Sequence, residues 1–174
     1  MKRTLLFLIL FAAPAAWAGA QHGPDAYLRI AMLARNRTTI GLLVDSGLDL
    51  GQTDDYVGRV NASRQAAEAV RYALADATGT QDADRVVELG DYLVKLYQDG
   101  LVPTLTAATE GVPDGSPAMT DLKVARERAV GDVTAAVALP FTTGKLGGSE
   151  RVKAMVGHLT VAAAGVKAAA EPKK

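Results

Sequence analysis

The chain has 174 residues, no cysteine, and 19 lysines and arginines against 19 aspartates and glutamates. This length is typical of one domain, and without cysteine the chain holds no disulfide, thiolate metal site or c-type haem. The balanced charge and an aromatic content of 5% exclude the strongly basic, aromatic-rich surfaces that bind nucleic acids.

Residues 1–20 have the features of a secretory signal peptide. Lys2 and Arg3 form a basic start, residues 5–13 are an apolar run, and residues 16–20 supply the small side chains of a cleavage site. The run is too short to span a bilayer, so we expect no stable membrane anchor after cleavage. A lipid anchor is excluded because no cysteine follows the run. Export by the general secretory route and a periplasmic or secreted location are predicted, with residues 21–174 as a single domain.

Helical patterns begin at Pro24. The first carries Ile30, Leu33 and Ile40 on one face and is expected to end near residues 45–48, at the glycines that follow. Its arginine-rich middle, residues 35–39, predicts either a solvated belt or a functional basic cluster. A second helix starts at the capping residues 53–55 and ends at Gly79.

Residues 83–108 form the central pattern. Their apolar residues recur in steps of three and four, and the valines beside them widen the stripe, so this helix is predicted to touch two or more neighbours. The stripe includes Val86, Leu89, Leu93, Leu96, Tyr97, Leu101 and Leu105. Gly100 and Pro103 predict either a kink, after which the helix resumes to residue 109, or a break. The continuing stripe favours the kink.

The last third of the chain predicts two more helices. Residues 111–117 are a loop, Ser116 caps a helix that stops near Pro140, and a glycine-rich connection leads to a final helix capped by Ser149. No segment alternates as a strand does. The predicted fold class is therefore all-α, an antiparallel up-and-down bundle of about five helices after the signal peptide.

Reactive constellations are missing from the sequence. His22 and His158 are isolated, so no metal site and no cofactor are expected, although the thioether of Met155 and the imidazole of His158, one turn apart, are ligand types for copper or haem iron. The acidic face of Asp84, Glu88 and its neighbours is typical of solvated charge. Gly144-Lys145 lacks the glycine and hydroxyl residues of a phosphate loop. No catalytic residue is predicted.

These features favour a non-enzymatic, exported interaction protein, such as an accessory factor, chaperone, inhibitor or toxin-neutralising protein. Its partner would be another periplasmic or envelope protein. The alternative is a bundle that holds an apolar small molecule or cofactor between its helices. The candidate partner surface is part of the central stripe, Leu96, Tyr97, Leu101 and Leu105, with Tyr97 as the preferred anchor because its ring tolerates a half-wet position.

Overall fold

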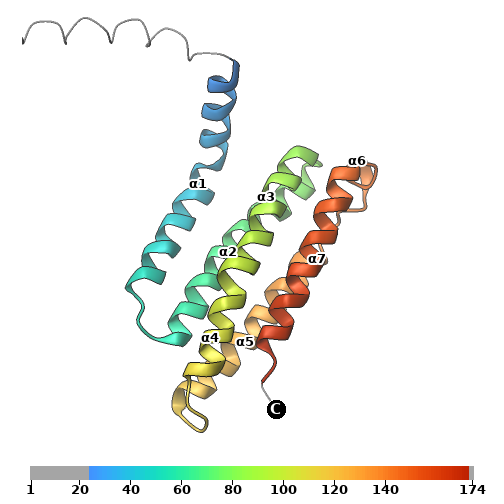
Figure 1. Cartoon of the computed structure of the whole chain (residues 1–174). Helices are drawn as coiled ribbons and strands as arrows, with labels where there is room; N and C mark the ends of the chain where they lie inside the picture. The colour runs from blue at the N-terminus through green and yellow to red at the C-terminus, as the bar shows by residue number, and fades with distance from the viewer. Residues whose placement is uncertain (1–23, 173–174) are drawn as a thin grey trace, which may run out of the picture. The chain divides into compact units, whose positions relative to one another are not determined.

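The computed structural model describes residues 24–172 (Figure 1). The predicted signal peptide and His22 lie outside the described residues. Within them all regular secondary structure is helical and no strand occurs, which confirms the all-α prediction. Two units are present: one ends at Thr38, and its described part is residues 24–38, while the other begins at Thr39.

Eight helical segments follow one another along the described part of the chain. They are α1 (Pro24–Gln52), α2 (Tyr56–Gly79), α3 (Ala83–Lys95), the π-helical turn η1 (Leu96–Leu101), α4 (Val102–Gly111), α5 (Pro117–Val137), the single turn α6 (Gly144–Gly147) and α7 (Glu150–Ala170).

Three helices begin with a side-chain cap, and two of these caps, in residues 53–55 and at Ser149, were predicted from the sequence. The backbone N–H of Gly58 donates to Asp55 at 2.7 Å, and that of Arg85 donates to Asp82 at 3.0 Å. The hydroxyl of Ser149 accepts from the N–H of Val152 at 3.4 Å. Each bond satisfies one of the donors that a helix leaves free at its N-terminus.

The predicted end of the first helix near residues 45–48 is wrong. Helix α1 continues through Gly47 to Gln52, because a glycine weakens a helix by only about 1 kcal/mol and does not by itself end it. Beyond Gln52, the hydroxyl of Thr53 donates to the carbonyl of Asp49 at 2.6 Å and occupies one of the acceptors left free at the helix end.

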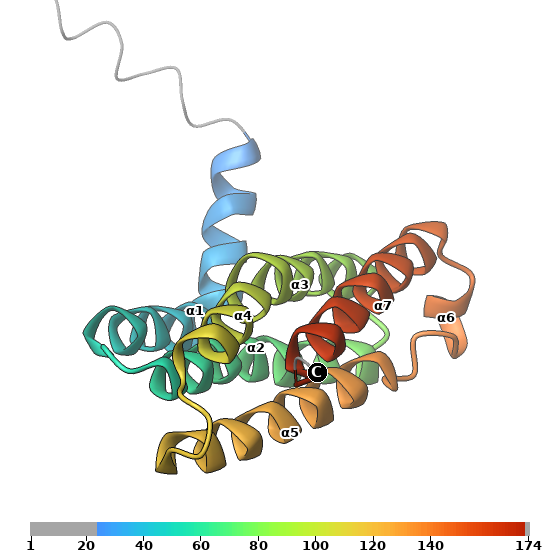
Figure 2. The ribbon, with the colours of Figure 1, turned by 60° about the horizontal axis from the view of Figure 1, so that its bottom comes forward.

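The core of the second unit lies between four helical elements, which are α2, the continuous run α3–η1–α4, α5 and α7. Helix α2 packs against α3 and α5, and α7 packs against α3 and α5. Helix α5 covers α2 and α7 on the side away from α3 (Figure 2). The continuous run α3–η1–α4 lies between α2 and α7, which explains why its apolar stripe is so wide. Fully buried side chains from all four elements include Val70, Leu74, Leu89, Leu93, Leu122, Val133 and Leu159.

The helical run α3–η1–α4 passes through Gly100 and Pro103 without ending. In η1 the N–H of Val102 bonds the carbonyl of Tyr97, five residues earlier. Proline has no N–H, and its ring collides with the carbonyl four residues back in a regular α-helix; the wider π turn makes room for it. The hydroxyl of Thr104 donates to the carbonyls of Gly100 and Leu101, both at 3.0 Å. The predicted continuation past Pro103 is therefore confirmed, and the helix ends at Gly111.

The π turn also keeps the apolar stripe in phase. Leu93, Tyr97, Leu101 and Leu105 are four residues apart, whereas an α-helix turns every 3.6 residues. Successive steps of four would carry such a stripe around a regular helix. With the wider turn between them, all four side chains stay within the core, each 1% exposed or less.

Two glycines allow close contacts between helices. A side-chain carbon at Gly90 of α3 would collide with Met155 of α7, and one at Gly111 would collide with the ring of Tyr56. The absence of a side chain at these positions lets a large neighbour lie directly on the helix backbone. Gly90 thus brings α3 and α7 together around a buried thioether.

Candidate functional site

The predicted partner surface on the central helix is not exposed. Tyr97, Leu101 and Leu105 are fully buried, and Leu96 is half-buried against the core. Their apolar atoms are covered by α2 and α7, which flank η1 and α4. Tyr97, Leu101 and Leu105 are therefore part of the core, and Leu96 lies at its edge.

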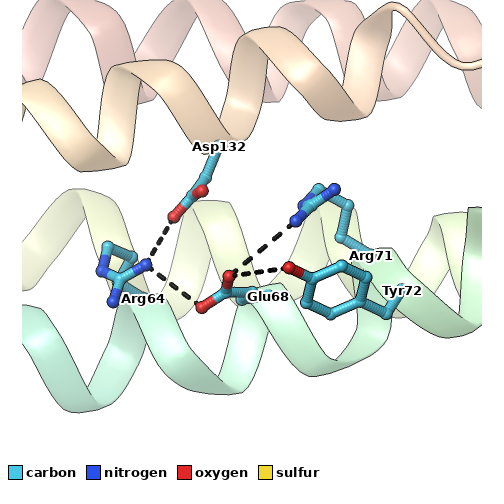
Figure 3. A network of polar contacts seen from close by, with 5 residues as sticks. All are labelled: Arg64, Glu68, Arg71, Tyr72 and Asp132. Atoms are coloured by element: carbon cyan, nitrogen blue, oxygen red, sulfur yellow. Dashed lines mark hydrogen bonds and ion pairs between the residues drawn. The ribbon is translucent and has the colours of Figure 1, made fainter.

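A cluster of charged side chains joins α2 to α5. Arg64, Glu68 and Arg71 are spaced by four and three residues, which places them on one face of α2. They face Asp132 of α5 (Figure 3). These three residues were not predicted as a cluster, although their spacing on α2 is a signal that the sequence contains. Their partner lies far along the chain, and only the fold brings it near.

Arg64 is the centre of this cluster. Its Nη1 donates to Oδ2 of Asp132 at 2.8 Å and to Oε2 of Glu68 at 3.2 Å. The other carboxylate oxygen of Glu68 lies 3.8 Å from Nη2 of Arg71 and accepts from the hydroxyl of Tyr72 at 3.3 Å (Figure 3). The guanidinium of Arg71 also lies over the Tyr72 ring, 4.3 Å from its centre.

The cluster is partly buried, and this determines its charge states. Burial lowers the pKa of Arg64, but the hydrogen bonds and negative charges of Asp132 and Glu68 raise it by more, so the net pKa is raised. Burial also raises the pKa of Tyr97, and the charge of Asp132 adds to this while Arg71 opposes it. Arg64 therefore stays charged and Tyr97 stays neutral at physiological pH.

This cluster links α2 to α5 through ion pairs and hydrogen bonds. Two cations face two carboxylates, so the charges balance and none is left over to attract an ion. Arg64 and Asp132 have side chains only 13% and 22% exposed, and no histidine or cysteine accompanies them. Across residues 24–172, no group of three histidines, aspartates and glutamates is arranged to hold a metal ion.

Other residues weighed in the sequence lie apart from this cluster. His158 is exposed on α7, while Met155 is buried. The N–H of Lys145 donates to the side chain of Gln81 at 3.0 Å, so the Gly144-Lys145 turn is tied to the α2–α3 connection. Asp84 forms an exposed ion pair with Arg151 at 2.7 Å.

A hollow of about 390 Å³ lies where α1 ends and α2 begins. It is open to solvent and its walls are mainly polar. They consist of Asp49, Gln52, Thr53, Gly58, Asn61, Ala62 and Gln65. An open, polar hollow of this kind lacks the apolar walls of most small-molecule sites.

The exposed apolar side chains of α1 are the clearest candidate for a functional surface. Ile40, Val44 and Leu48 recur every four residues and are 39%, 55% and 57% exposed. The opposite side of this part of α1 is inward-facing, since Leu43 packs against the core and Ser46 is buried. In the first unit Tyr27, Ile30 and Leu33 are each at least 60% exposed.

The sequence pattern alone does not reveal this surface, because it places Ile30, Leu33 and Ile40 on one helical face without indicating whether another element covers that face. An exposed apolar stripe and a buried one have the same sequence pattern, and they differ only in whether another helix packs against them. No helix among the described residues is both long enough and apolar enough to cross a membrane. No protein-family model, curated protein or solved structure matches this chain.

Proposed function

We propose that this protein is an exported, non-enzymatic interaction protein that binds an envelope protein through the exposed apolar side chains of α1. In this proposal the signal peptide is removed, and the remaining helices form an antiparallel up-and-down bundle that carries α1. The proposed periplasmic or secreted location is supported by residues 1–20, whose basic start, apolar run and small-residue end are typical of secretory signals.

The observation that carries the proposal is the concentration of exposed apolar side chains on one helix. In the described part of the chain, seven of the twelve exposed large apolar side chains come from α1. The other five are scattered over α2, α3, α5 and α7. Single exposed apolar residues are ordinary, whereas a group of them marks an interaction site.

The proposed antiparallel order is supported by the short connections of the second unit. Three residues separate α2 from α3, and five separate α4 from α5. Connections of this length join helices that run in opposite directions. The alternative of an apolar ligand held between helices receives no support from the hollow beside α1, which is open and polar.

Photo-crosslinking in the intact cell envelope tests the proposal. A crosslinking amino acid at Val44 should capture an envelope protein, and Val44→Asp should abolish the capture. Val161 is the matched control, because it is an isolated valine on α7 that is 67% exposed. Crosslinking at Val161, or equal loss of capture by Val161→Asp, would contradict the assignment to α1.

Intact mass of the purified protein tests the export part independently. The mature chain is expected to begin at Gly19 or Gln21. A mass that still includes residues 1–18 would refute the signal-peptide assignment without bearing on the role of α1.

A further inference from the structure

The apolar row on the second half of α1 leads into the hollow at the end of that helix. The row consists of Ile40, Val44 and Leu48, which recur every four residues and are exposed. The next step of four reaches Gln52, which lines the hollow. The row and every residue that lines the hollow belong to the second unit. They therefore form one continuous surface, which we call the α1–α2 surface.

Negative charge follows one edge of this surface. Asp45 and Asp49 come directly after Val44 and Leu48, both are exposed, and Asp49 also lines the hollow. Residues 39–55 contain four aspartates and no lysine or arginine. Neither Asp45 nor Asp49 forms an ion pair with another residue of the described chain. The α1–α2 surface thus combines an apolar row with carboxylates that no described cation pairs.

These carboxylates destabilise the end of α1 in the free protein. Asp45 and Asp49 are four residues apart on a helix, a spacing at which like charges repel. The C-terminal end of a helix has a partial negative charge and favours cations, yet the last turn of α1 contains no basic residue. A cation bound beside Asp49 would relieve both effects.

The hollow offers hydrogen-bond acceptors as well as negative charge. Gln52, Asn61 and Gln65, whose side-chain amides each have an acceptor oxygen, line it together with Asp49, and no lysine or arginine lies in its walls. The hydroxyl of Thr53 already donates its proton to the carbonyl of Asp49 at 2.6 Å, which leaves its oxygen as a further acceptor. Such a set suits the several N–H donors of an ammonium or guanidinium group.

We propose that the α1–α2 surface binds a basic amphipathic helix of the partner protein. Its apolar side chains cover the row, and one of its lysine or arginine side chains enters the hollow beside Asp49. The row extends about 12 Å from Ile40 to Leu48, which matches about two turns of a partner helix with apolar residues every three or four positions. The inference rests on the proposed function, because it names the chemistry of the partner.

The carboxylates determine the charge of this helix. Any partner that covers Val44 and Leu48 also removes water from Asp45 and Asp49, which border them. A neutral or acidic partner would leave these charges unpaired at the edge of the interface, and that costs binding free energy. A basic partner pairs them instead.

Binding of designed peptides to the full chain, purified as the cell processes it, tests the inference. A fluorescent helical peptide of about 18 residues, with leucines at every third or fourth position and lysines beside them, should bind. Its affinity should fall as salt is added, since exposed charge pairs are screened. A peptide with glutamate in place of every lysine should not bind. Fluorescence anisotropy measures both dissociation constants.

Variants locate the binding. Replacing Asp45 and Asp49 together by asparagine should raise the dissociation constant of the lysine peptide about tenfold, because two charge pairs are lost. Leu48→Ala should raise it as well, since apolar contact area is removed. Thermal unfolding should show no loss of stability in either variant, because all three positions are exposed. Asp121→Asn on α5 and Val161→Ala on α7 are matched controls at exposed positions and should leave the dissociation constant unchanged.

Three results would overturn the inference: no binding of the lysine peptide, equal binding of the glutamate peptide, or binding that the surface variants do not weaken. Crosslinking from Val44 in the envelope separates this outcome from the proposed function. Capture of an envelope protein at a segment without lysine or arginine would reject the basic helix and leave the proposed function standing. Capture of a second copy of this chain alone, or no capture at all, would reject the proposed function itself.

Discussion

The run α3–η1–α4 and the helix α1 carry the same kind of sequence pattern and reach opposite outcomes. In the run, Leu93 and Leu101 are completely buried, whereas on α1 Leu48 is 57% exposed. Periodicity reports that one face of a helix is apolar; it does not report whether another element covers that face. The same apolar periodicity therefore corresponds to core positions in the run α3–η1–α4 and to a candidate binding surface on α1.

Neighbours account for the difference. The run α3–η1–α4 lies between α2 and α7, and both helices contact it along its length. The second half of α1 has only one inward side, where Leu43 packs against the core and Ser46 is buried. An apolar face is thus left open on a helix that already uses its other face.

Truncation of matched leucines should produce the largest contrast. Leu93→Ala is expected to lower the free energy of unfolding by about 2–5 kcal/mol, because it removes fully buried atoms and leaves a cavity. Leu48→Ala should change it by less than about 0.5 kcal/mol, as surface substitutions usually do. Urea unfolding at low protein concentration measures both. Equal losses would mean that α1 is as well packed as the central run.

Glycine substitutions should give effects of opposite sign. At Gly90→Ala the new methyl group meets Met155, and we expect a loss of about 1–3 kcal/mol from overpacking. At Gly41 of α1 a new side-chain carbon meets nothing within 4 Å, so Gly41→Ala should gain up to about 1 kcal/mol from helix propensity. Thermal unfolding compares the two variants, and destabilisation by Gly41→Ala would show a hidden contact on α1.

The free energy of unfolding at alkaline pH should show a smaller effect, which comes from the burial of Tyr97. The folded state raises the pKa of Tyr97 above its ordinary value, which is about 10. Above that pH the unfolded chain releases the phenolic proton while the folded chain retains it. The stability associated with Tyr97 is therefore complete below about pH 10 and declines as the pH rises further.

Tyr97→Phe should accordingly flatten the fall in unfolding free energy between about pH 9 and pH 11. Tyr27→Phe is the control on α1: Tyr27 is 73% exposed, and this variant keeps Tyr97 and the wild-type slope. If the two variants have the same slope, the ionisation of Tyr97 is not linked to folding.

Features determined by a few adjacent residues could be predicted from sequence. Asp55, Asp82 and Ser149 cap their helices because each partner N–H is three residues away. The continuation through Pro103 was also predictable, since Leu101 and Leu105 carry the apolar stripe past the proline.

Features that depend on distant partners could not be predicted in this way. Arg64 bonds Asp132, 68 residues later, and nothing local indicates which carboxylate it meets. Tyr97 was placed on a candidate surface because its amphipathic ring suits either environment; only the positions of α2 and α7 make it a core residue. Likewise, the sequence of α1 does not indicate whether another helix covers its apolar face.

The contact between Gly90 and Met155 has a consequence for oxidation. Met155 is 2% exposed, and its side chain lies directly over the Gly90 backbone, so a sulfoxide would place a polar oxygen in a closely packed apolar contact. We expect peroxide to reach this buried sulfur when α3 and α7 separate, and the added oxygen to hinder their return. The rate at which Met155 is oxidised therefore measures how often these two helices open, and each oxidation event converts a transient opening into a lasting one.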